Sequence, residues 1–261
     1  MARITIIDPA ALADAAAERL AEQIDHAIAI YGAATVSLTG GSTPRAMYEA
    51  LADGSRRWRD RIDWARVHLY WGDERHVPPD HADSNFGMAF HALVQHVPIP
   101  PGHVHRMRGE LPEPKVAAAE YEQQLPEVFD VMLLGLGDDG HIASIFPGSP
   151  VLDAWRSRSG AGTTATEPAR SPRVAALSTS KGWRITLTPK PILASREIVM
   201  LVAGENKAAA VAAALEGPLD VNSCPAQLLR EAGERVEWII DTAAGERLRS
   251  RQDALRSASM T

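Results

Sequence analysis

Residues 129–137 read FDVMLLGLG, an apolar run that leads directly into two glycines. A short apolar run bounded by turn-forming residues is typical of a strand that is buried on both faces. Residues 197–204, EIVMLVAG, have the same character. Strands of this kind belong to parallel sheets that carry helices on both faces, so the two segments predict an α/β fold.

Strand-like and helix-like segments alternate on either side of these two runs. Further strands are expected at 3–7, 34–40, 66–74, 184–188 and 236–244, and helices at 9–32, 43–53, 83–97, 113–128, within 189–195, at 206–217 and beyond 244. This alternation predicts βαβ units and a mainly parallel sheet. The polar stretch at 157–172, SRSGAGTTATEPARSP, is expected to be a mobile surface loop, because the alternation resumes beyond it. We therefore expect residues 1–261 to form a single domain.

Composition excludes several classes of protein. The 261 residues are 45% hydrophobic and 23% charged, with a formal net charge of −6. This acidic balance argues against a nucleic-acid partner, although local cations would suffice for a small anionic ligand. The single cysteine, Cys224, cannot form an intramolecular disulfide or a cysteine metal cluster. No signal peptide and no membrane-spanning apolar run is recognisable, so we expect a cytoplasmic protein without a membrane partner.

The segment SLTGGSTPRAMYEAL at 37–51 places two glycines between an expected strand and an expected helix. Gly40 and Gly41 allow the backbone to turn sharply and approach a ligand, and the amides at a helix start, together with Ser42, attract anions. The pattern is neither a Walker loop nor the GxGxxG fingerprint. A phosphate-binding turn and an ordinary capped strand-to-helix turn explain it equally well.

The segment YWGDERHVPPDHADSN at 70–85 delivers charged residues to the end of an expected strand. Open α/β sheets bind ligands at the carboxyl ends of their strands, which makes Asp73 and Arg75 candidate substrate-binding residues. The Arg75 guanidinium has the donors to bind a phosphate or carboxylate, or to polarise a carbonyl oxygen. Ser84 and Asn85 are expected to cap the next helix. A solvated charged loop is the alternative interpretation.

The segment GLGDDGHIASIFPGS at 135–149 follows the buried run directly. Asp139 and His141 flank Gly140, so both side chains can approach one site from a tight turn. A carboxylate beside one imidazole nitrogen fixes the tautomer and leaves the other nitrogen as a base near neutral pH. A zinc site would need a third ligand, and the chain has no HExxH motif. A capped glycine-rich turn with a surface histidine remains an alternative.

The segment LVAGENKAAAVAAAL at 201–215 places Lys207 near a helix start, just after an expected strand. From there the ammonium group could reach an anion at the same edge of the sheet. A solvated lysine is the alternative.

Taken together, these segments resemble the 6-phosphogluconolactonase family, within the larger group that includes glucosamine-6-phosphate deaminase. The resembling segments are SLTGGSTP, WGDERHVPPDHADSN, LLGLGDDGHIASIFPGS, RITLTPKPIL, VAGENKAAAV and VEWIIDTAA, between Ser37 and Ala244. The resemblance implies a three-layer α/β/α fold with a Rossmann-like parallel sheet. It implies hydrolysis of 6-phosphoglucono-δ-lactone, the second step of the oxidative pentose phosphate pathway, without a cofactor or metal. We expect a phosphorylated sugar lactone as the substrate and a monomer or weak homodimer as the assembly.

The resemblance also implies roles for the candidate residues. His141 matches the general base that activates water, and Asp139 matches the position beside it. Arg75 and Lys207 match cations that hold the phosphate or the lactone oxygens. The phosphate-cradling turn is matched by Gly40, Gly41 and Ser42.

One segment departs from the family pattern. Members often carry a lysine in a segment of the type S-P-K-P-P before the strand that matches RITLT, whereas residues 177–188 read LSTSKGWRITLT. Lys181 and Arg184 are the two candidate phosphate contacts in this segment.

Two other functions fit parts of the pattern. An aminosugar-phosphate deaminase typically continues the D-G-H motif with F-N-E-P-G-S, and here Ile145 and Phe146 stand where Asn and Glu would be. The missing carboxylate favours a lactonase. A non-catalytic sugar-phosphate-binding module is usually fused to a DNA-binding domain, and the residues before Ser37 hold only a strand and one helix. The intact Asp-Gly-His motif also favours an enzyme.

Overall fold

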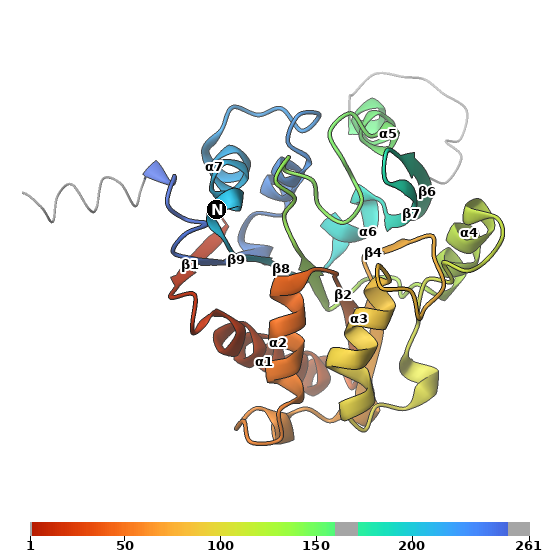
Figure 1. Ribbon diagram of the computed structural model, residues 1–261, viewed down its shortest axis with the longest axis vertical. Helices are drawn as coiled ribbons and strands as arrows, with labels where there is room; N and C mark the ends of the chain where they lie inside the picture. Colours follow the sequence, from red (N-terminus) through yellow and green to blue (C-terminus); the bar gives the residue numbers. More distant parts are fainter. Residues whose placement is uncertain (1, 160–171, 250–261) are drawn as a thin grey trace, which may run out of the picture.

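The main sheet of the computed structural model has six parallel strands (Figure 1). The structure describes residues 2–159 and 172–249, and only the backbone of 156–159. In spatial order the strands are β1 (Arg3–Ile7), β9 (Val236–Asp241), β8 (Glu197–Val202), β5 (Val131–Leu134), β2 (Ala34–Leu38) and β3 (Val67–Trp71). All six coincide with expected strands, and the predicted α/β fold with a mainly parallel sheet is confirmed.

Helices cover both faces of this sheet. One face carries α1 (Leu12–Tyr31), α2 (Ser42–Ala52) and α3 (Asn85–Ala92), and the other carries α6 (Pro189–Ala194), α7 (Ala208–Glu216) and the 3₁₀ segment η6 (Pro225–Arg235). The remaining elements are α4 (Pro114–Gln124), α5 (Pro150–Ser159) and the single 3₁₀ turns η1 (Arg59–Arg61), η2 (Trp64–Arg66), η3 (Val94–His96), η4 (Pro101–His103) and η5 (Glu205–Lys207).

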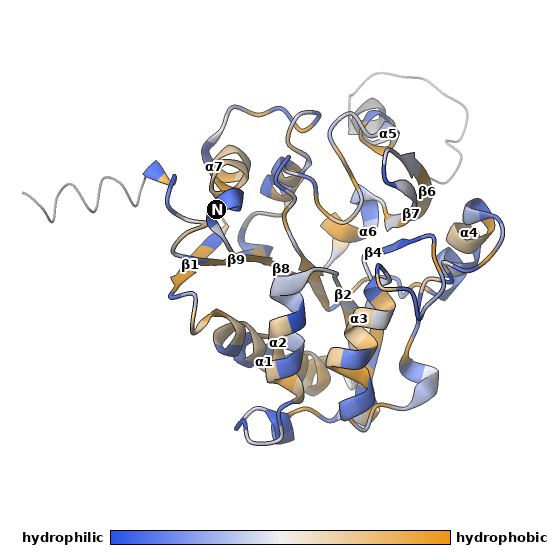
Figure 2. Cartoon of the chain, in the orientation of Figure 1, coloured by the Kyte–Doolittle hydropathy of each residue, from blue (hydrophilic) through white to orange (hydrophobic). Residues whose placement is uncertain are grey.

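The buried strands explain the apolar runs of the sequence. Side chains alternate across a strand, so Val131 and Leu133 of β5 pack into the core with α1 and α2, while Met132 and Leu134 pack into the core with α6 and α7. Every residue of β5 is buried. In Figure 2 the central strands carry hydrophobic colour, and the segment around β4 carries hydrophilic colour.

A second, smaller sheet was not expected from the sequence. It is antiparallel and consists of β4 (Asp73–Arg75), β7 (Gly182–Leu187) and β6 (Val174–Thr179). The strand expected at 66–74 therefore ends at Trp71, and the chain changes sheets at Gly72. The Gly72 N–H donates to Leu38 O at 2.9 Å and its carbonyl accepts from Leu187 N at 2.8 Å. Gly72 thus joins the carboxyl edge of the main sheet to the small sheet.

Three other expectations need adjustment. The loop expected at 157–172 begins later, because α5 continues to Ser159, and residues 160–171 lie outside the described residues. The helix expected at 83–97 is split, because Leu93 leaves the helical region with φ −135° and ψ −61°. Beyond 244 the chain forms turns to Arg247, and the rest of the expected C-terminal helix falls mostly outside the described residues. None of the described helices is long and apolar enough to cross a membrane.

The strand order defines a crevice at one edge of the sheet. Strand β2 pairs with β3 on one side and with β5 on the other, so the direction of winding reverses at β2. In open parallel sheets, ligands bind outside the carboxyl ends of the strands at such a point. The turns that contain Gly40 and Gly137 leave β2 and β5 there.

Candidate active site

A continuous cleft lies at this carboxyl edge. Its inner part is a cavity of about 280 Å³, and its outer part is a cavity of about 820 Å³. The two parts share Gly137, His141, Phe146, Lys181 and Lys207. Of the other sequence-predicted residues, the inner part is lined by Gly40, Gly41, Asp73, Arg75 and Arg184, and the outer part by Asp139. The fold therefore brings residues from five distant sequence segments to one site.

The Asp139–His141 pair is built on a tight turn. Gly140, with φ +81°, allows the chain to reverse, and the Gly137 N–H donates to the His141 carbonyl at 2.9 Å. His141 Nδ1 lies 2.5 Å from Asp139 Oδ1, which also accepts the His141 backbone N–H at 3.1 Å. With the proton assigned to Nδ1, the carboxylate fixes the tautomer and leaves Nε2 as the basic nitrogen.

The electrostatics of Asp139 suit this contact. Partial burial alone would raise the pKa of the Asp139 carboxyl, but hydrogen bonds from the His141 side chain and backbone outweigh it. The net result is an Asp139 pKa below the usual value. The carboxylate therefore stays ionised and can orient the imidazole across the neutral pH range.

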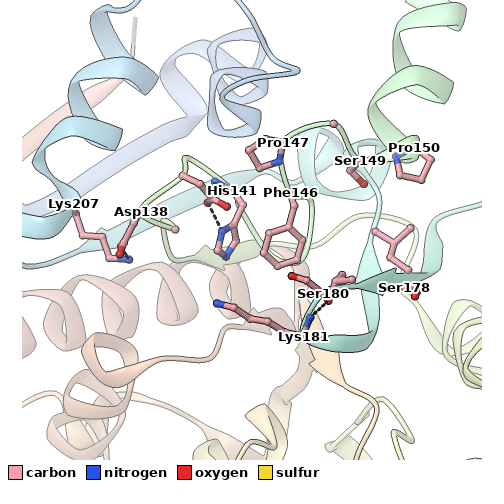
Figure 3. A pocket seen from close by; sticks show the side chains of 15 residues that line it. Asp138, His141, Phe146, Pro147, Ser149, Pro150, Ser178, Ser180, Lys181 and Lys207 are labelled. Carbon is pink, nitrogen blue, oxygen red and sulfur yellow. Dashed lines mark hydrogen bonds and ion pairs between the residues drawn. The ribbon is translucent and has the colours of Figure 1, made fainter.

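Phe146 forms one side of the imidazole environment. The rings of His141 and Phe146 lie 4.4 Å apart between centroids, at an angle of 41° (Figure 3). Ile145 is fully buried in the core. At the two positions where a deaminase typically carries Asn and Glu, this chain thus presents a core side chain and an aromatic ring against the imidazole.

The two adjacent aspartates have different partners. Asp138 forms an ion pair with Lys207 Nζ and accepts a hydrogen bond from Asn206 Nδ2 at 3.0 Å. The hydrogen bond from Lys207 is the main reason that the Asp138 pKa lies below its usual value. Figure 3 shows Lys207 and Asp138 on one side of His141. The sequence did not indicate this pairing, because Asp138 and Lys207 are far apart along the chain.

Two arginines are cross-strand neighbours in the small sheet. Arg75 of β4 pairs in register with Arg184 of β7, and both line the inner cavity. Arg75 Nη1 donates to Asp83 O at 2.5 Å, while its buried Nε has no hydrogen-bond partner among the described residues. Burial and then the nearby Arg75 cation lower the pKa of Arg184. Two like charges on one cavity wall favour an anion between or beside them.

A buried polar network lies next to these arginines. Asp73 accepts a hydrogen bond from Ser144 Oγ at 2.5 Å and one from Asn85 Nδ2 at 3.2 Å. A Cβ atom at Gly40 would lie 1.8 Å from Asn85 Oδ1, so this turn has room only for glycine. Asn85 and Ser144 both line the inner cavity, and sequence reasoning did not propose either as a site residue. For Asn85 a signal existed, since it follows the DERHVP segment in the same motif.

Gly41 and Lys181 line the cleft, whereas Ser42 does not. Gly41 has φ +115° and precedes α2, and it lines the cavity beside Gly40. Ser42 is exposed and is not among the residues that line the cavity, so its expected place in the cradle is not supported. Lys181 is exposed in the two-residue turn between β6 and β7, and it lines both parts of the cleft (Figure 3).

Glu74 anchors α3, and thereby Asn85, to the small sheet. Its carboxylate accepts the backbone N–H groups of Asn85 and Phe86, both at 2.7 Å, and the Ser84 hydroxyl at 3.0 Å. Burial raises the Glu74 pKa above its usual value although these hydrogen bonds oppose the shift. Ser84 caps the same helix through the Gly87 N–H, as the sequence predicted.

Replacement of Glu74 by alanine is expected to lower the free energy of unfolding by about 2–4 kcal/mol, because buried N–H groups at the start of α3 would lose their acceptor. Urea unfolding with an unchanged m value measures this loss. Glu113→Ala is a matched control, since Glu113 is an exposed carboxylate before α4 without a capping hydrogen bond. Equal effects of the two substitutions would contradict this role of Glu74.

The described residues provide no ready metal site. Within 2–159 and 172–249, no group of three or more His, Cys, Asp or Glu side chains is arranged to hold a metal ion.

Comparison with known proteins agrees with the fold and shows the family. Residues 7–238 match the family of glucosamine-6-phosphate isomerases/6-phosphogluconolactonase. A 6-phosphogluconolactonase of Synechocystis is 36% identical over 237 residues, which cover 87% of this chain and 90% of that protein. A 6-phosphogluconolactonase of Mycobacterium tuberculosis is 38% identical over 260 residues, which cover 92% and 95%. The solved structure of 6-phosphogluconolactonase from Trypanosoma brucei has a TM-score of 0.76 at 28% identity, covering 95% of this chain and 99% of that one. The chain therefore belongs to the glucosamine-6-phosphate isomerase/6-phosphogluconolactonase family.

Proposed function

We propose that this protein hydrolyses 6-phospho-D-glucono-1,5-lactone to 6-phospho-D-gluconate, the second step of the oxidative pentose phosphate pathway. The observation that carries the proposal is the Asp139–His141 pair, which shares one cleft with several cations. The cleft thus offers a base for water and positive charge for a phosphorylated, ring-closed ester. The names of the relatives at 36% and 38% identity support the same reaction.

His141 is the proposed general base. Nε2 takes a proton from a water molecule whose oxygen forms a bond to the lactone carbonyl carbon. When the tetrahedral intermediate collapses, the bond from that carbon to the ring oxygen breaks, and the ring oxygen takes the proton from the His141 imidazolium and becomes a hydroxyl. The resulting carboxylic acid ionises to the carboxylate. Asp139 holds the imidazole in the required tautomer and stabilises the imidazolium that forms transiently.

Cations of the cleft are proposed to hold the anionic groups of the substrate. The phosphate would lie against the Gly40–Gly41 turn before α2, with Arg184 and Lys181 supplying charge. Lys207 and Arg75 supply positive charge to the phosphate or to the carbonyl oxygen that becomes negative in the intermediate. Asp73, held by Asn85 and Ser144, would accept hydrogen bonds from sugar hydroxyl groups.

The proposal includes the cellular setting. We propose that residues 1–261 work as a single domain, as a monomer or weak homodimer, in the cytoplasm and without a metal or cofactor. The acidic net charge of −6 supports a freely diffusing enzyme rather than a nucleic-acid-bound one.

The function is tested with lactone generated in situ from glucose 6-phosphate by its dehydrogenase. We expect the purified protein to accelerate loss of the lactone well above the spontaneous rate, as read by acid release or by coupled oxidation of 6-phosphogluconate. Glucosamine 6-phosphate serves as the second substrate, with ammonia as the readout. Ammonia release without an effect on the lactone would show that the protein is a deaminase.

A further inference from the structure

The segment from Pro218 to Gln227 touches the turn that carries the proposed base. The Ala226 N–H donates to the Gly140 carbonyl at 2.9 Å. The Cys224 thiol packs on the same glycine, since a Cβ atom at Gly140 would lie 2.7 Å from Cys224 Sγ. Cys224 is only 7% exposed, so this contact is part of the core rather than of the surface. Gly140 is thus held from outside the turn by one hydrogen bond and one close packing contact.

The same segment holds the turn that carries Phe146. The Gly148 N–H donates to the Asn222 carbonyl at 2.9 Å, two residues beyond the aromatic ring. Because Phe146 packs on the His141 imidazole, the segment fixes the ring of the base and its neighbour together.

Buried hydrogen bonds tie the segment to the rest of the fold. The Gln227 side chain, 2% exposed, accepts the Asp220 N–H at 2.6 Å and donates to Ala213 O at 2.8 Å and Pro218 O at 2.9 Å. Asp220 O in turn accepts the Cys224 N–H at 2.9 Å. Ala213 belongs to α7, the helix that begins directly after Lys207. The hydrogen bond from Gln227 therefore connects the segment to the helix that positions the cleft lysine.

We propose that residues 218–227 act as a brace for the catalytic turn, and that Cys224 is a positioning residue of the lactonase reaction. This proposal rests on the proposed function, because it assigns the brace to the base of that reaction. A base must lie within hydrogen-bond reach of the water that it deprotonates, and a displacement of about 1 Å can lower the rate by about 100-fold. The size of the side chain at position 224 sets how closely Gly140, and with it His141, can approach the brace.

Three substitutions in the brace leave the cleft lining untouched. Cys224→Leu adds bulk against Gly140 and is expected to lower kcat by about 10-fold or more, with KM within about 2-fold. Cys224→Ser keeps the size of the side chain and is expected to retain kcat within about 3-fold. Gln227→Leu removes the anchoring hydrogen bonds from the other end and is expected to lower kcat while KM stays unchanged. If Cys224→Leu does not fold, Gln227→Leu still tests whether the brace affects kcat.

A matched control and a second readout complete the experiment. Ala16→Val adds bulk at a buried position of α1, in the core on the opposite face of the sheet, and should leave kcat unchanged. The His141 Nδ1 proton, placed to donate to Asp139, is expected to give a low-field NMR resonance that reports the geometry of the turn without any turnover. We expect this resonance to move in Cys224→Leu and Gln227→Leu but not in Ala16→Val.

The two readouts separate the brace from the proposed function. If the wild-type protein does not hydrolyse the lactone and the resonance still moves, the function is wrong and the brace stands. If kcat and the resonance are unchanged in both Cys224→Leu and Gln227→Leu, the brace is overturned. A parallel rise of KM would also overturn it, because the segment would then act on substrate binding.

Discussion

Replacement of His141 by alanine is expected to lower kcat for the phosphorylated lactone by about 100- to 10,000-fold, with little change in KM. The Asp139 carboxylate lies 2.5 Å from Nδ1 of the His141 imidazole. This contact orients the ring, so that Nε2 can act as the base. The cations that would bind the substrate are left in place, so the loss should fall on turnover. Initial rates above the spontaneous opening of the lactone measure the effect.

Two further variants make this prediction specific. Asp139→Asn is expected to lower kcat less than His141→Ala does, because the base remains but its tautomer and orientation are no longer fixed. His26→Ala removes an exposed histidine of α1 that does not line the cleft, and should leave kinetics unchanged. A rise of KM in His141→Ala at constant kcat would assign this residue to substrate binding instead of proton transfer.

The main sheet could be predicted chiefly from its central strands, β5 and β8, which are short, buried on both faces and almost entirely apolar. β5 and β8 are recognisable from four to six consecutive residues each. The small sheet was missed because β4 is only the three residues Asp73–Arg75, all of them charged, and its two buried carboxylates, Asp73 and Glu74, are held by hydrogen bonds rather than by apolar packing. β6 was missed because its half-buried residues show no clear alternation.

In the candidate site, contacts within one local segment could be predicted, whereas contacts between distant segments could not. The contact between Asp139 and His141 could be anticipated because both belong to one tight turn. The pairing of Asp138 with Lys207 and the register of Arg75 opposite Arg184 depend on tertiary structure, since each joins segments that are far apart along the chain. The close approach of Cys224 to Gly140 has no local signal at all. Cys224 can approach this closely because Gly140 has no side chain. A glycine at this position is already explained by the positive φ of the tight turn, so it does not point to Cys224.

Arg184→Ala is expected to raise KM for the phosphorylated lactone by about 10- to 100-fold, because a charge-assisted hydrogen bond to the phosphate would be lost. The half-buried guanidinium lies next to Arg75, and burial, followed by repulsion from the Arg75 cation, lowers the pKa of Arg184. A phosphate dianion relieves this repulsion, so the pair should bind phosphate more strongly than either arginine would in water. The measurement is kcat/KM for the phosphorylated lactone relative to unphosphorylated glucono-δ-lactone.

The two-substrate comparison tells phosphate binding from lactone activation. If Arg184 holds the phosphate, Arg184→Ala lowers kcat/KM for the phosphorylated substrate and leaves the unphosphorylated one nearly unchanged. Arg184→Lys should recover part of the loss, since it restores the charge without the planar fork. Lys190→Ala is the charge-matched control, because Lys190 is an exposed cation of α6 that does not line the cleft. An equal loss of kcat on both substrates would contradict this role and assign Arg184 to the carbonyl oxygen. The phosphate would then be bound by the Gly40–Gly41 turn and Lys181.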